Sequence, residues 1–169
     1  VKHTHDIASV QPAAVELTVS VTDGAQRLRD MLRRADLAMF HEEHPITIGP
    51  PHGRTTPDFF FPDLTDRYEG ICIYLDGLGR SGHGDPVTQA RDASIRDTLR
   101  NHEYEVISIS HTDLTDREAM ARYFGRIGRA LVSRTRADEL RADTSWFDDP
   151  PATAHSTRHQ GPPLSLIHI

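Results

Sequence analysis

The sequence predicts an α/β or α+β fold in which helices cover a small mixed sheet. Apolar runs of strand length and apolar stripes at helical spacing both occur, and the two patterns alternate along the chain. This alternation is typical of layered folds with helices packed on a sheet. The predicted helices span about 24–41, 87–102 and 115–134, and the predicted strands lie at 15–21, 59–61, 71–75 and 105–110.

Residues 1–22 are interpreted as a linker or as an edge strand of a preceding region. Apolar and polar residues alternate over 15–21, which is the period of a half-buried strand. A helix follows, because Thr22 or Asp23 can cap its free amides, and His44-Pro45 is expected to end it. Its apolar stripe comprises Leu28, Met31, Leu32, Ala35 and Met39.

The middle of the chain supplies the centre of the predicted sheet. Proline and glycine residues indicate a loop at 49–57. Three phenylalanines at 59–61 form a short strand that Pro62 closes. Residues 71–75 are almost uninterruptedly apolar, which suits a central strand buried on both faces. A glycine-rich loop then leads to a helix that begins near Pro86, a residue favoured in the first helical turn.

Helical periodicity ends after about Arg141, so we place the domain at 23–141 and expect 142–169 to be a flexible tail. Trp146 and Phe147 are expected to dock on a neighbouring surface that the sequence does not identify. The last five residues resemble adapter read-through and are left out of the fold prediction.

The composition indicates a soluble and rather polar protein. Its 169 residues allow one ordinary domain, and its formal net charge is −6. No apolar run approaches the roughly 18 to 20 residues that a membrane span needs. The only cysteine, Cys72, cannot close an internal disulfide, which favours the cytoplasm. Because the chain begins at Val1 rather than at methionine, we expect a fragment of a longer protein.

Two aspartates are the first candidates for chemistry. Asp58 starts one predicted strand and Asp76 ends the next, so a strand, a turn and a second strand can bring both to one sheet edge. A divalent cation relieves the repulsion between such carboxylates, and Mg²⁺ favours one or two of them together with waters and substrate phosphates. His83 on the following loop is a candidate general acid or base. The alternative is that both aspartates only cap or turn the chain.

A family resemblance adds to this interpretation. The residues that support it are Thr56-Pro57-Asp58-Phe59, Ile73-Tyr74-Leu75-Asp76-Gly77, His83, Arg91-Asp92 and, beyond Leu99, Tyr104-Glu105-Val106-Ile107. Over about 24–131 the chain resembles the very-short-patch-repair-like branch of the PD-(D/E)xK nucleases. The resemblance is closest to versions fused at the C-terminal end of large bacterial helicases.

This resemblance implies a restriction-endonuclease-like domain with a mixed sheet of three to five strands and helices on both sides. It also implies Mg²⁺-dependent hydrolysis of DNA, with Mn²⁺ as a possible substitute, in a helicase-linked protein of phage defence or DNA repair. Asp58 matches the metal-binding aspartate of the PD motif, and Asp76 matches the second acidic position. His83 matches the downstream histidine, and Asp92 matches an acidic residue on the next helix.

The chain departs from the family pattern at four places, one of which is a longer loop between Gly77 and His83. Tyr74 stands where many relatives carry a glutamate, Gln26 stands where an upstream glutamate often assists, and no lysine lies near Asp76. Fewer carboxylates imply weaker metal binding. A catalytically inactive DNA-binding or docking module with the same fold is therefore an alternative.

The segment Gly77-Leu78-Gly79-Arg80-Ser81-Gly82 matches the GxGxxG pattern and gives a second alternative, a dinucleotide-binding Rossmann-like domain. Three features oppose it. The helix starts only near Pro86, Asp76 places a negative charge beside the expected phosphate, and no acidic residue ends the next strand.

The predicted helix at 115–134 is rich in arginine. Arg122, Arg126 and Arg129 share the face opposite its apolar stripe. Such a row is a candidate for contacts with DNA phosphates, which would make binding weaken steeply with salt. An ordinary solvated helix face is the alternative.

Overall fold

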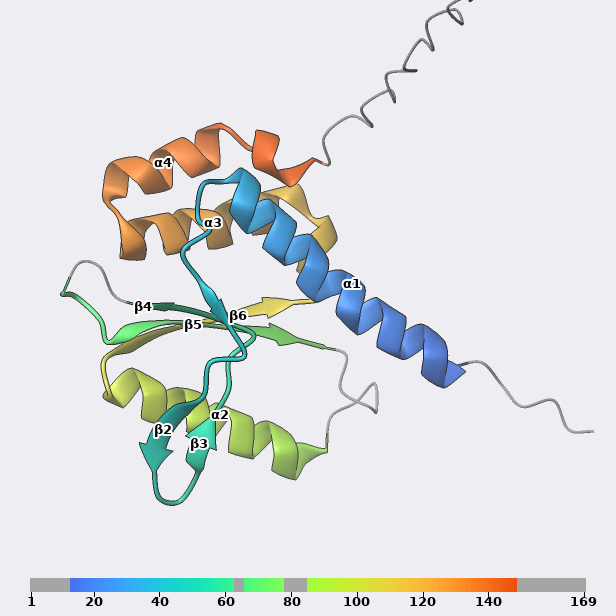
Figure 1. The fold of residues 1–169 in the computed structure, drawn as a ribbon, viewed down its shortest axis with the longest axis vertical. Coiled ribbons are helices and arrows are strands. Elements are labelled where there is room, and N and C mark those ends of the chain that lie inside the picture. Colours follow the sequence, from blue (N-terminus) through green and yellow to red (C-terminus); the bar gives the residue numbers. More distant parts are fainter. Residues whose placement is uncertain (1–12, 63–65, 78–84, 149–169) are drawn as a thin grey trace, which may run out of the picture.

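The computed structural model describes residues 13–62, 66–77 and 85–148, and it confirms a mixed sheet flanked by helices (Figure 1). The helices are α1 (Ala13–Arg34), α2 (Pro86–Asn101), α3 (Arg117–Leu131) and α4 (Arg134–Ala142), with 3₁₀ turns η1 (Asp113–Thr115) and η2 (Ser145–Phe147). The strands are β1 (His41–Glu42), β2 (Ile46–Gly49), β3 (Gly53–Thr55), β4 (Phe59–Pro62), β5 (Gly70–Asp76) and β6 (Tyr104–Ser110). No described helix combines the length and apolar character that crossing a membrane requires.

The main sheet has the strand order β1-β4-β5-β6. Strands β4 and β5 are antiparallel, with Phe59 opposite Ile73. Strands β5 and β6 are parallel, with Asp76 opposite Ser110, and α2 is the crossover between them. The start of β4 and the ends of β5 and β6 therefore lie at one edge of the sheet.

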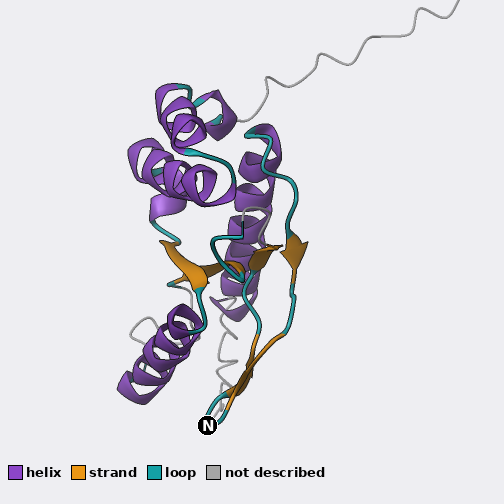
Figure 2. Cartoon of the chain, turned by 90° about the vertical axis from the view of Figure 1, so that its left-hand side faces the viewer, coloured by secondary structure: helices purple, strands orange, loops and turns teal. Residues whose placement is uncertain are grey.

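The sheet separates two apolar layers. Helices α1, α3 and α4 cover one face, whereas α2 and the β2–β3 hairpin lie on the other (Figures 1 and 2). Strand β5 serves both layers, because Ile71 and Ile73 join the larger core and Cys72 joins the smaller one. The prediction that 71–75 forms a central strand is therefore correct. The smaller core comprises Ile46, Ile48, Phe60, Cys72, Leu99 and Val106.

The loop predicted at 49–57 is instead part of a hairpin. Strands β2 and β3 pair across it as a separate two-stranded sheet. Gly49 and Gly53 both have left-handed φ angles, +76° and +74°, which glycine adopts at little cost. The glycines and prolines thus mark a tight turn between two short strands.

Helix α1 begins at Ala13, so the strand predicted at 15–21 is wrong. A strand needs a neighbour for its backbone hydrogen bonds, whereas a helix satisfies them internally. Strands β1 and β6 are the outermost described strands of the main sheet, and no described strand pairs with residues 15–21. The predicted stripe holds over Leu28, Met31, Leu32 and Ala35, which are all buried.

Helix α1 also ends earlier than predicted. Asp36 has a left-handed φ of +56°, and its N–H donates to the carbonyl oxygen of Arg33. The N–H of Leu37 donates to the carbonyl oxygen of Leu32, which completes a Schellman C-cap with two buried leucines. Met39, predicted to extend the stripe, is 61% exposed because the chain has already left the helix.

The folded domain continues past Arg141, the residue at which the predicted domain ends. Trp146 and Phe147 of η2 are buried in the larger core. The indole of Trp146 stacks on Phe124 of α3 with 4.0 Å between ring centroids, and its Nε1–H donates to the carbonyl oxygen of Leu140. The surface on which these two aromatic residues dock is thus the α1–α3 side of the same domain.

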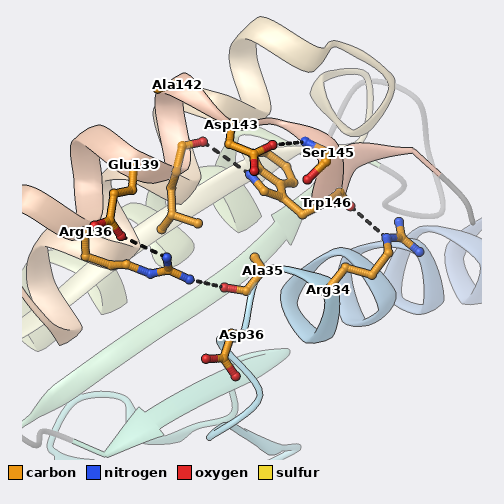
Figure 3. Close-up of a pocket in the computed structure, with 10 residues that line it drawn as sticks. Arg34, Ala35, Asp36, Arg136, Glu139, Ala142, Asp143, Ser145 and Trp146 are labelled. Carbon is orange, nitrogen blue, oxygen red and sulfur yellow. Dashed lines mark hydrogen bonds and ion pairs between the residues drawn. The ribbon is translucent and has the colours of Figure 1, made fainter.

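Arginines tie α4 and η2 to the end of α1, around a pocket of about 470 Å³ (Figure 3). Arg34 donates to the carbonyl oxygen of Trp146 at 2.8 Å. Arg136 donates to the carbonyl oxygen of Ala35 at 2.7 Å and pairs with Glu139 at 3.0 Å. These arginines satisfy carbonyl groups of the buried residues Trp146 and Ala35, so they stabilise the fold at this junction.

Candidate functional site

The structure brings Asp58 and Asp76 to the same edge of the sheet. Asp58 precedes β4, and its Oδ2 accepts a hydrogen bond of 2.8 Å from the N–H of Leu75. This bond fixes the Asp58 carboxylate beside the peptide that joins Tyr74 to Leu75. We call these two aspartates, together with Arg96 and His111, the acidic rim.

The protein around Asp58 disfavours its ionised form. The residue as a whole is exposed, but its carboxylate is enclosed on the side of β5. This desolvation raises the pKa of Asp58; the hydrogen bond from Leu75 opposes the rise, and the charge of Asp76 adds to it. His111 is close enough for its charge to lower the same pKa. A positive partner at this position would therefore relieve an electrostatic cost.

Arg96 of α2 forms an ion pair with Asp76 Oδ1. Its guanidinium also lies over the ring of Tyr74, 5.4 Å from the centroid. The hydroxyl of Tyr74 is hydrogen-bonded to Thr55 of β3 at 2.9 Å, and burial raises the pKa of Tyr74 to about 12. Tyr74 is therefore neutral at physiological pH and holds Arg96 through its ring face.

His111 is the rim residue that sequence reasoning missed. It follows β6 directly, and its N–H donates to the carbonyl oxygen of Asp76 at 2.8 Å. A Cβ at Gly24 of α1 would overlap the His111 ring, so the glycine makes room for this imidazole. The signal was available, because the carboxyl ends of parallel strands meet at one edge, where ligands commonly bind.

The other predicted residues lie away from the described rim or outside the described residues. Asp92 is exposed on α2, one turn before Arg96, and forms no hydrogen bond or ion pair with a described residue. Gln26 is exposed on α1 and donates to Asp30 at 3.0 Å. His83 and the glycine motif beyond Gly77 lie in 78–84, outside the described residues.

The predicted arginine row runs away from the acidic rim. Arg126 of α3 pairs with Glu105 and donates to the carbonyl oxygen of Val106, near the start of β6. The rim lies at the other end of that strand, roughly 15 Å away at 3.3 Å per residue. Arg122 and Arg129 are exposed, and Arg122 pairs with Glu118 at 3.4 Å.

The described rim offers two carboxylates to a cation. Within residues 13–62, 66–77 and 85–148, no three side chains of histidine, cysteine, aspartate or glutamate form a ready-made metal site. Mg²⁺ commonly uses one or two carboxylates and completes its shell with waters and substrate phosphates. Asp58 and Asp76 therefore fit such an ion, provided that Arg96 releases Asp76.

The fold and rim together define an α/β domain with a carboxylate pair at the carboxyl edge of its central strands. Comparisons of the chain with models of protein families, with curated proteins and with solved structures found no match. The geometry of the rim is therefore the feature of this chain that indicates its function.

Proposed function

We propose that this domain is a Mg²⁺-dependent endonuclease that hydrolyses DNA phosphodiester bonds. We further propose that it acts in the cytoplasm, within a helicase-linked protein of phage defence or DNA repair. The observation that supports the activity is the convergence of Asp58 and Asp76, which lie far apart in sequence, at one sheet edge. The resemblance to very-short-patch-repair-like nucleases, which assigns both residues to metal binding, adds support.

In this proposal the two rim aspartates bind the metal, and three other residues assist them. Asp58 and Asp76 hold Mg²⁺ or Mn²⁺, which when bound polarises the phosphate and lowers the pKa of the attacking water. The N–H of Leu75 orients the Asp58 carboxylate. His83 is the proposed acid or base, and Asp92 is a supporting carboxylate one helical turn from Arg96.

The test is cleavage of supercoiled and linear DNA with Mg²⁺ or Mn²⁺ by the parent chain, Asp58→Asn and Asp76→Asn. We expect each substitution to lower the cleavage rate by at least a hundredfold, because each removes a charged ligand and leaves the shape unchanged. Asp97→Asn is the matched control: Asp97 is 72% exposed on α2 and pairs with Arg100. Cleavage that survives both rim substitutions would rule out this site.

A specific observation favours a second candidate, a DNA-binding module without cleavage. Arg96 already neutralises Asp76, and Tyr74 occupies a position that is often acidic in the family. In that case the parent chain binds DNA and cleaves nothing with either cation. Substituting Arg122, Arg126 and Arg129 together with glutamine would then weaken binding and flatten its salt dependence.

A further inference from the structure

The guanidinium of Arg96 occupies the position at the rim where a cation is needed. It contacts Asp76 Oδ1, and its side chain is only 22% exposed, whereas that of Asp76 is 39% exposed. Asp58 lies close enough to the same aspartate for the charge of Asp76 to raise its pKa. One fixed positive charge thus balances one of two neighbouring carboxylates.

One contact besides the ion pair holds Arg96 in this position. Its guanidinium lies over the ring of Tyr74, and Tyr74 is anchored to Thr55 of the β2–β3 hairpin. Arg96 itself projects from α2, whose first turn is fixed by the Asp85 N-cap. A guanidinium held in this way loses little further conformational entropy when it binds a carboxylate.

A divalent cation that binds both aspartates has to compete with this guanidinium. The two positive charges repel one another at short distance, and the hydrogen bond from Arg96 occupies one of the lone pairs that Asp76 offers to a cation. In the absence of metal, the ion pair between Arg96 and Asp76 stabilises the folded protein. The same ion pair lowers the affinity of the rim for a divalent cation.

We propose that Arg96 is a positioning residue of the rim that holds Asp76 in the metal-free protein and yields it when a divalent cation binds. This inference rests on the proposed function, because it takes Asp58 and Asp76 as the ligands. It goes further in assigning an opposing role to a residue outside the ligand set. Removing the guanidinium should therefore tighten cation binding, where loss of a merely structural residue would weaken it.

The experiment is titration of the full chain with Mn²⁺ by isothermal calorimetry. We expect Arg96→Gln to lower the Kd for Mn²⁺ about fivefold, which corresponds to about 1 kcal/mol and suits a partly exposed pair. Arg96→Lys keeps the charge and should stay within about twofold of the parent. In EDTA, Arg96→Gln should melt at a lower temperature than the parent, and Mn²⁺ should raise its Tm by more.

Arg100→Gln is the matched control, because it removes the same charge from the same helix but breaks only the exposed pair with Asp97. Its Kd should equal that of the parent. If Arg96→Gln unfolds, Arg96→Met provides the same test, since it keeps the apolar stem over Tyr74.

Equal or weaker Mn²⁺ binding by the Arg96→Gln and Arg96→Met variants would overturn the inference. The proposed cation site fails separately if Asp76→Asn binds Mn²⁺ as tightly as the parent. If Asp76→Asn loses Mn²⁺ and neither Arg96 variant gains affinity, the site stands and only the role of Arg96 is refuted.

Discussion

Replacing Trp146 with alanine tests whether the segment after α4 is part of the folded core. Trp146 is 4% exposed, stacks on Phe124 and donates to the carbonyl oxygen of Leu140. Truncating a buried aromatic side chain to alanine costs about 3 to 5 kcal/mol. Trp146 and Leu140 both line the pocket beside α4, from which water can reach the freed carbonyl after truncation, so we expect about 3 kcal/mol.

The assay is urea unfolding followed by far-UV circular dichroism, since Trp146 is the only tryptophan and its loss removes the fluorescence signal. In a thermal melt followed by the same signal, the Tm of Trp146→Ala should fall by roughly 10 °C, at about 2 to 4 °C per kcal/mol. Trp146→Phe keeps a ring on Phe124 but loses the hydrogen bond, and should cost about 1 kcal/mol. Val132→Ala, at a site 55% exposed, should cost under about 0.5 kcal/mol. A loss below 1 kcal/mol for Trp146→Ala would refute the packing described here.

Three further predictions follow from packing and ionisation. Gly128→Ala should destabilise by about 1 kcal/mol in urea unfolding, because its Cβ would lie 2.6 Å from Cδ1 of the buried Leu140. Gly125→Ala should be neutral or stabilising, because its Cβ would meet the side chain of Arg141, which is exposed and can move aside. Asp58→Asn should raise the urea midpoint at pH 7, because the folded pKa of Asp58 is raised above its ordinary value of 3.8. The difference should shrink as the pH falls through the folded pKa and vanish once the pH is well below 3.8, where both states are protonated. Burial raises the pKa of the Cys72 thiol to about 12, so Ellman's reagent at pH 8 should label it only after unfolding.

The sheet and the two helices around β6 could be predicted because their apolar patterns are strong and local. The run at 71–75 contains no charge, and it forms the strand that both cores share. The α3 stripe over Met120, Phe124 and Ile127 is fully buried, as its spacing requires. In such segments, burial of one face determines the secondary structure.

The prediction failed where tertiary contacts determine the structure. Alternation at 15–21 indicates a strand only if a partner strand exists, and the described fold offers none. Helix α4 buries only Ala137 and Leu140, which is too weak a stripe to recognise in a polar segment. Trp146 reaches the core through a contact with α3 that leaves no periodic trace in the sequence.

The candidate site could also be predicted only in part. Asp58 and Asp76 flank two successive apolar strands, so their convergence follows from an antiparallel pairing. Arg96 reaches Asp76 only because α2 packs back across the sheet, and the helix pattern alone does not specify that register. His111 depends on the parallel pairing of β5 with β6, which the chain order suggests only once α2 is recognised as a crossover.

Several local costs meet at this one edge of the molecule. Gly24 lies inside α1, although glycine disfavours helix by about 1 kcal/mol relative to alanine. It lies beside the ring of His111. Asp58 keeps a partly desolvated carboxylate next to Asp76, although an amide would accept the same hydrogen bond from Leu75 without that penalty. Residues that serve folding alone rarely concentrate such penalties, whereas binding and catalytic sites commonly do. The distribution of these costs therefore supports placing the function at the acidic rim rather than at the pocket beside α4, where the arginines pair with acidic side chains and carbonyl groups that stabilise the fold.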